Sequence, residues 1–164
     1  MTMITRYINT LILCAVLLLS LSCDKGKALS TGNREKKPVD FELGVPICPV
    51  CNMNVFTLKH AVELINEQGE TYLFDDVGCT ILWIDEQKLD LEKAVIWIYA
   101  QDTKRWIDAK KARYSLIDNT PMRYGFAGYE HNRENFVPFQ EMRLRMLRGL
   151  TLKDPKIRKN LLGK

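Results

Sequence analysis

The sequence predicts an α+β fold made of two ββαβ-like units, in which small antiparallel or mixed sheets pack against helices. Short apolar runs with the two-residue period of strands recur along the chain, and each group is followed by a segment with apolar residues at three- and four-residue intervals. The chain has 164 residues, of which 46% are hydrophobic and 27% are charged. This composition is that of one globular domain and excludes a fibrous or disordered protein.

Residues 1–22 are predicted to form a signal peptide. Arg6 supplies the positive charge, and the apolar run over 11–21 is shorter than the roughly 20 residues that a membrane-spanning helix needs. The run ends at Cys23 in an imperfect bacterial lipobox, in which Ser20 stands where an aliphatic residue is usual. We therefore expect lipidation of Cys23. The alternative is a plain secretory signal that leaves Cys23 as a free or disulfide-bonded thiol.

The segment 23–43 is polar and has no hydrophobic period, so we expect a flexible linker between the lipid anchor and the folded domain. The protein would then be a lipoprotein of the cell membrane that faces the periplasm, with the choice between inner and outer membrane left open. We expect the folded domain to occupy 44–150. A basic tail over 151–164 follows, to which we assign no role and in particular no nucleic-acid binding.

The first unit is expected between residues 60 and 99. The alternating segment 60–66 predicts a strand, Gln68 and Gly69 a turn, and 71–74 the returning strand of a hairpin. Asp75 and Asp76 are good N-caps for a helix over 77–86. The segment 94–99 is rich in β-branched and aromatic residues and predicts a buried central strand.

The pattern then recurs in the second unit. The expected strands are 105–107, 113–117 and part of 124–129, and a helix is expected from Pro138 to Arg148.

The motif Cys48-Pro-Val-Cys51 places two thiols on one tight loop, where they can share a metal ion or form a disulfide. Met53 adds a thioether two residues later, and Met122 lies on a turn-forming stretch that is an unusual place for a methionine that only fills the core. Thiolate and thioether ligands together select Cu(I), whereas a closed structural zinc site needs four Cys or His ligands. The sequence therefore predicts a Cu(I) site.

Four motifs in this order resemble the NosL family, the membrane-anchored copper-binding lipoproteins that assist the assembly of nitrous-oxide reductase. They are Cys48-Pro-Val-Cys-Asn-Met53, Phe74-Asp-Asp-Val-Gly-Cys79, Trp106-Ile-Asp-Ala109 and Thr120-Pro-Met-x-Tyr-Gly125. The resemblance implies a pair of ββαβ units and a periplasmic Cu(I) site that loads the apo-reductase with the help of an ABC-type membrane complex. It implies Cys51, Met53 and Met122 as ligands, and Cys48 as in those members that have a second cysteine.

Two residues depart from the family pattern, in which glycines follow the ligand cysteine and the ligand methionine. Asn52 can adopt the left-handed backbone that such a glycine supplies. Arg123 places a cation beside the site, where it would favour thiolate and could alter which partner docks.

Other readings of the same residues stay open. Cys79 is expected to pack against the sheet, and His60 and His131 are possible nitrogen ligands that we do not include in the site. We predict a binding protein rather than an enzyme. The alternatives are a thiol-disulfide oxidoreductase that uses Cys48 and Cys51, and a zinc-stabilised interaction module.

Overall fold

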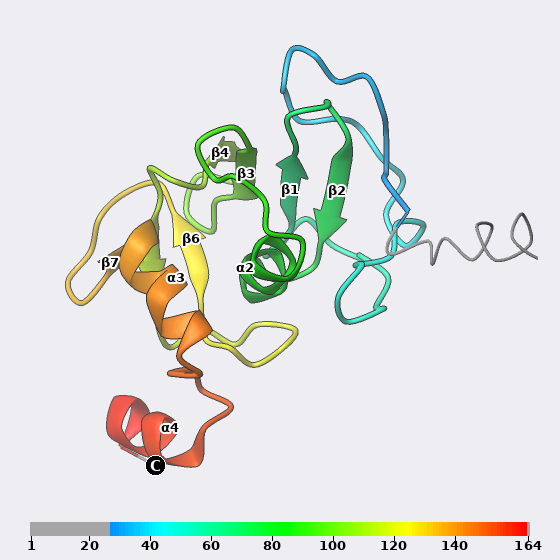
Figure 1. The fold of residues 1–164 in the computed structure, drawn as a ribbon. Coiled ribbons are helices and arrows are strands. Elements are labelled where there is room, and N and C mark those ends of the chain that lie inside the picture. The colour runs from blue at the N-terminus through cyan, green and yellow to red at the C-terminus, as the bar shows by residue number, and fades with distance from the viewer. Residues whose placement is uncertain (1–26, 164) are drawn as a thin grey trace, which may run out of the picture.

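The computed structural model describes residues 27–163, so the predicted signal peptide and Cys23 lie outside the described residues. The fold is α+β, as predicted, with two small antiparallel sheets and three helices in the described part of the chain (Figure 1). None of these helices has the length and apolar character that crossing a membrane requires.

The first sheet has the strand order β2-β1-β3-β4, with every pairing antiparallel. Its strands are β1 (Val62–Ile65), β2 (Thr71–Phe74), β3 (Val95–Tyr99) and β4 (Trp106–Asp108), and the helix α2 (Val77–Glu86) connects β2 to β3. The expected ββαβ unit is therefore present, and β3 lies inside the sheet as predicted for a central strand. Asp76 caps α2 by accepting a hydrogen bond from the Gly78 backbone N–H at 2.8 Å.

The second sheet has the order β6-β5-β7 and is also antiparallel. Its strands are β5 (Arg113–Ser115), β6 (Ala127–Tyr129) and β7 (Val137–Pro138), and α3 (Phe139–Leu147) follows β7 directly. This second unit is βββα, an order that differs from the predicted ββαβ-like unit. The strand expected over 105–107 is β4, which pairs with β3 in the first sheet, and β7 was not predicted because two residues are too few to show a period.

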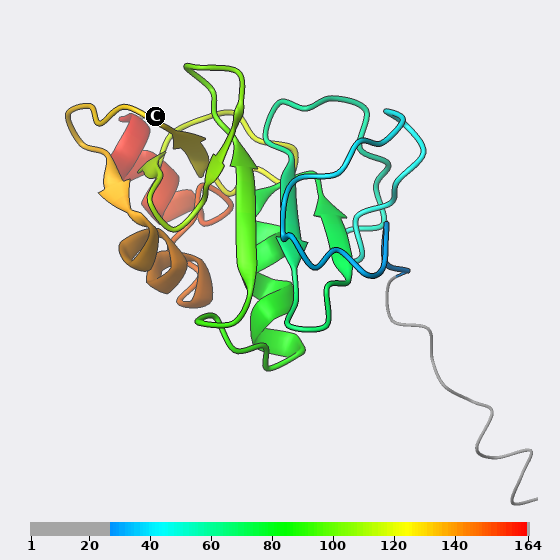
Figure 2. The ribbon, with the colours of Figure 1, turned by 90° about the horizontal axis from the view of Figure 1, so that it is seen from above.

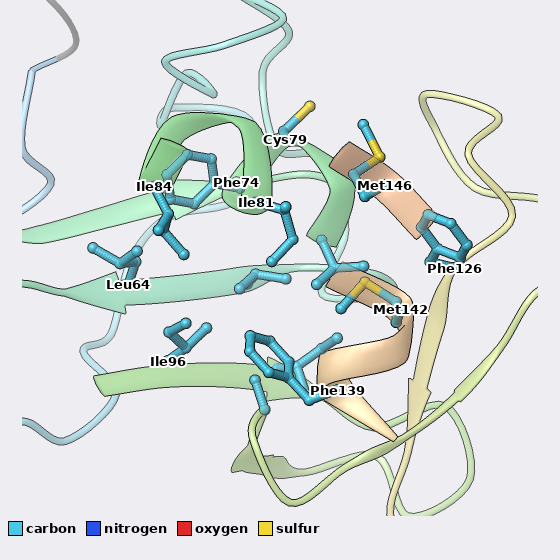
Figure 3. Packing of buried hydrophobic residues seen from close by; sticks show 14 of the residues in the cluster. Leu64, Phe74, Cys79, Ile81, Ile84, Ile96, Phe126, Phe139, Met142 and Met146 are labelled. Carbon is cyan, nitrogen blue, oxygen red and sulfur yellow. The ribbon is translucent and has the colours of Figure 1, made fainter. Parts of the chain in front are cut away.

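The main core lies between the first sheet and the two helices α2 and α3 (Figure 3). Alternate residues of the central strands point toward α2, among them Leu64 and Ile96, which are fully buried. Phe139 and Met142 of α3 close the same core from the second unit. The two units therefore share one core.

Residues 27–43 belong to the folded domain, although the sequence predicted a flexible linker there. The Leu29 N–H donates to the Thr71 carbonyl at 2.7 Å, and the Val39 N–H donates to the Glu63 carboxylate at 3.0 Å. The segment lies along the face of the first sheet opposite α2 (Figure 2). It shows no period because it is held by its backbone rather than by an apolar stripe.

The expected basic tail is also partly structured. Thr151 and Leu152 are buried, and the Leu152 N–H donates to the Tyr124 carbonyl at 3.1 Å. A short helix follows, α4 (Pro155–Leu162), in which no residue is buried. The domain therefore extends at least to Leu152.

Candidate metal centre

The loop that carries the two cysteines of the Cys-x-x-Cys motif is closed by its own backbone. The Cys48 N–H donates to the Met53 carbonyl at 2.9 Å, and the Asn52 N–H donates to the Cys48 carbonyl at 3.0 Å. Asn52 has a backbone φ of 60°, which lies in the left-handed region. This is the conformation that we expected an asparagine to adopt in place of glycine. Backbone hydrogen bonds from Val50 and Cys51 reach the Cys48 sulfur. The loop is thus shaped to hold a thiolate.

Three cysteines and one carboxylate meet at this loop. The ligand atoms of Cys48, Cys51, Asp75 and Cys79 all lie within 4.8 Å of one another. The Cys51 thiol donates to Asp75 Oδ1 at 3.2 Å. Asp75 Oδ2 is buried without a hydrogen-bond partner among the described residues, which is unusual for a buried oxygen. The four groups together could hold a metal ion.

The start of α2 supplies two of these groups. Asp75 stands between the end of β2 and the N-cap of the helix, and Cys79 lies in the first turn. Figure 3 shows the Cys79 sulfur directed away from Phe74 and Ile81, at the edge of the packed side chains. The loop 48–51 packs against that edge from outside the sheet, so residues far apart in the sequence share one site.

The thiols differ in their affinity for a proton. The pKa of Cys48 is lowered to about 7, chiefly because the Cys79 thiol donates a hydrogen bond to its sulfur, while burial opposes the shift. Burial raises the pKa of Cys51 to about 12. The pKa of Cys79 is raised strongly, first by that hydrogen bond to Cys48 and then by burial. The site therefore offers one thiolate near neutral pH, and a metal ion bound by all three sulfurs would displace two protons.

The two predicted methionine ligands reach the same corner of the fold by different contacts. The Met53 side chain is 39% exposed and lines a cavity of about 430 Å³ together with Asp75 and Pro121. The Met122 N–H donates to Asp76 Oδ2 at 3.1 Å, which ties the 120–122 turn to the beginning of α2. The structure thus unites Cys48 with Cys51, whereas coordination by the thioethers of Met53 and Met122 stays a prediction.

Two residues of the cluster were not predicted from the sequence. Asp75 was explained as a helix cap, but only Asp76 caps the helix, and Asp75 faces the thiols instead. Cys79 was expected to pack against the sheet; it is indeed buried, but its sulfur belongs to the cluster. The signal that could have identified them is the position of both residues within the motif Phe74-Asp-Asp-Val-Gly-Cys79.

The histidines do not join this cluster in the described part of the chain. His60 is buried beside Thr120 and Arg123, and its two ring nitrogens have no partner among the described residues. His131 lies on the surface, where Nδ1 is 2.9 Å from an oxygen of Asp102.

No protein-family model matches the chain, and no curated protein matches it either.

Proposed function

We propose that the protein is a lipid-anchored metallochaperone that holds one Cu(I) ion between the sulfurs of Cys48, Cys51 and Cys79 and passes it to an apo cuproenzyme outside the cytoplasm. The observation that carries this proposal is the approach of three sulfur atoms, from a loop and a helix, to within 4.8 Å of one another. Cu(I) is the soft ion that thiolate ligands select and that is stable with few ligands. Met53 and Met122 are the candidates for a further thioether ligand.

The graded exposure of the sulfur residues supports transfer rather than permanent storage. Met53 is 39% exposed, Cys51 is half-buried, and Cys48 and Cys79 are fully buried. An ion that arrives at Met53 can be handed inward to Cys51 and then to the buried pair by exchanging one ligand at a time. The reverse order releases it to a partner that offers stronger ligands.

The anchor and the recipient are parts of the same proposal. Lipidation of Cys23 would keep the domain at the membrane on the periplasmic side. The resemblance to the NosL family names apo nitrous-oxide reductase as the recipient, assisted by an ABC-type membrane complex. A gene for that reductase beside the gene for this chain would support the assignment, and its absence would favour another cuproprotein.

The copper site is tested by Cu(I) titration of the reduced protein, made without its lipid as the Cys23→Ser variant, in competition with a chromophoric chelator. We expect one Cu(I) per chain, and at least about 100-fold weaker binding when Cys51→Ser or Cys79→Ser removes a thiolate. Met146→Leu changes a buried sulfur of the core and is the matched control, for which we expect unchanged affinity. Parental affinity in both cysteine variants would refute the site.

A zinc site is the second candidate, and Asp75 is the observation that favours it. With the carboxylate included, the cluster has three sulfurs and one oxygen, which is the number of ligands that tetrahedral Zn²⁺ requires. We expect Asp75→Asn to leave Cu(I) affinity within a few-fold of the parent, because the amide removes only a hard ligand, and to weaken Zn²⁺ binding about tenfold or more. Parallel competition titrations with the two ions measure this. Equal losses for both ions would show that Asp75 acts on the fold of the site rather than on metal selection.

The oxidoreductase alternative receives less support from the structure. In that class the Cys-x-x-Cys motif opens a long helix. Here it lies on a loop whose flanking residues Ile47 and Asn54 form an isolated antiparallel bridge.

A further inference from the structure

Exposed apolar side chains gather on the loop that carries the Cys-x-x-Cys motif. Nine large hydrophobic residues are exposed in the described part of the chain, and five of them lie between residues 43 and 56. One of the five is Met53. The other four are Leu43 (48% exposed), Val45 (61%), Ile47 (55%) and Phe56 (74%), and we call these four residues the apolar loop face. Clustered exposed apolar groups mark a surface that contacts a partner or a membrane.

The described chain begins beside this face. A groove of about 510 Å³ is lined on one side by Lys27, Ala28 and Leu29 and on the other by residues of the loop, including Val45 and Ile47. Figures 1 and 2 show both segments on the same side of the first sheet, away from the second unit. Leu29 is fixed there by its backbone hydrogen bond to Thr71 at 2.7 Å.

The distance from this groove to the proposed lipid anchor is limited by the covalent chain. Four peptide units separate Cys23 from Lys27, and they span at most about 14 Å when fully extended. Residues 27–43 do not lengthen this connection, because hydrogen bonds hold the segment along the sheet. If Cys23 carries the lipid, as the proposed function states, the groove can lie no further than about this distance from the bilayer surface.

We propose that the apolar loop face inserts into the lipid interface, so that the membrane orients the domain with its metal loop close to the bilayer. The acyl chains on Cys23 would hold the chain at the bilayer but would not fix the orientation of the domain, and the apolar loop face provides a second membrane contact beside the anchor. Lys27, in the same groove, adds a cation that suits anionic headgroups. Lipid is favoured over a protein partner because Val45 and Ile47 of this face line the groove at which the anchored chain enters the fold.

Depth-dependent fluorescence quenching tests this orientation in the full lipoprotein. The protein is reconstituted into vesicles of phosphatidylethanolamine and phosphatidylglycerol that contain phospholipids brominated near the headgroup. The variant Ile47→Trp places a probe on the apolar loop face, and Ile117→Trp places one on an exposed apolar site outside it (53% exposed). We expect bromolipid to quench the emission that the tryptophan at position 47 adds to that of the parent protein, which has three tryptophans, clearly more than the emission added at 117. Equal quenching at the two positions would overturn the proposal and would indicate that the apolar loop face binds a protein partner instead.

A second measurement tests membrane binding by the apolar loop face independently of lipidation and of copper binding. The unlipidated Cys23→Ser protein is tested for partitioning onto the same vesicles without bromine. We expect weak binding that falls about tenfold in Ile47→Asp/Phe56→Asp and not in the matched control Ile117→Asp. Loss of Cu(I) binding with vesicle binding intact would count against the proposed function alone. Unchanged partitioning of the double variant would count against the apolar loop face alone.

Discussion

Gly78 shows how a single residue adjusts the helix that carries the metal centre. It lies in the first turn of α2, where a glycine is unfavourable by about 1 kcal/mol relative to alanine. A glycine is needed here because the Tyr124 ring lies close to the helix backbone: a Cβ atom at position 78 would lie 2.2 Å from Cδ2 of Tyr124. The helix and the 120–125 segment can therefore meet only if position 78 has no side chain.

We expect Gly78→Ala to destabilise the protein by about 1–3 kcal/mol, because overpacking against Tyr124 outweighs the gain in helix propensity. Urea unfolding followed by circular dichroism measures the change. Asp85→Ala, at an exposed position of the same helix, is the matched control and should alter stability by no more than about 0.5 kcal/mol. A Gly78→Ala variant more stable than the parent would show that Tyr124 moves aside freely.

At the residue scale, the sequence predicted what depends on local geometry. The left-handed backbone of Asn52 and the capping role of Asp76 follow from the residue type and its neighbours, and both are present. The approach of Asp75 and Cys79 to the thiols of the loop could not be predicted in this way. It depends on how the 48–51 loop packs against α2, which is a tertiary contact that residue type and neighbouring residues do not determine; only the motif 74–79 pointed to it.

At the scale of the element, β1 is unusual because it buries a carboxyl group. Glu63 is 0% exposed and faces the segment 27–43, with one oxygen accepting from the Val39 N–H and the other without a partner among the described residues. Burial raises its pKa from the ordinary value of 4.5 to about 7. The folded state therefore holds this proton at pH values at which the unfolded chain has already lost it.

This shift has a defined sign for stability. A raised acid pKa favours the folded state fully below about pH 4.5, and the advantage is lost as the pH rises to about 7, by on the order of 3 kcal/mol. We expect Glu63→Gln, which cannot ionise, to gain stability relative to the parent as the pH is raised from 5 to 8. Urea unfolding of both proteins at several pH values in this range measures the difference. A difference that stays constant across the range would contradict an elevated pKa.

The prediction of elements succeeded where a strand or helix was long enough to show its period. The segments 60–66, 71–74 and 94–99 contain β1, β2 and β3, and the helix expected over 77–86 has the same bounds as α2. The strand β7 was missed because two residues have no period, and its pairing with β5 is decided by the register of the sheet. The second unit was therefore predicted without β7, and the strand expected over 105–107 belongs to the first sheet as β4.

At the scale of the whole molecule, the extent of the folded domain was predicted too narrowly at both ends. Residues 27–43 have few apolar side chains, yet Leu29 and Phe41 pack against a second small cluster formed by Val55, Ala61 and Leu73. At the other end, Leu152 packs beneath Gly125, where its Cγ lies 2.7 Å from the position of an added Cβ. Composition alone does not reveal segments that are held mainly by backbone hydrogen bonds and a few anchoring side chains.

Truncation distinguishes a tether from a structural segment. A chain that begins at residue 27 keeps every contact described here, whereas one that begins at residue 42 loses the hydrogen bonds that Thr71, Glu63 and Trp97 make with the segment, as well as the contacts of Leu29 and Phe41. We expect the shorter chain to be less stable by about 3 kcal/mol or more, as judged by urea unfolding at pH 6.

The pH dependence adds a readout that a general loss of stability would not produce. Without its cover, Glu63 becomes accessible to water, so the shorter chain should also lose most of the change in stability between pH 5 and 8 that burial of this carboxyl group causes in the parent. The chain that begins at residue 27 should retain it. If the chain that begins at residue 42 were as stable as the longer one at every pH, residues 27–41 would be the flexible linker that their composition suggests, and the reach from Cys23 to the apolar loop face would no longer be limited to four peptide units.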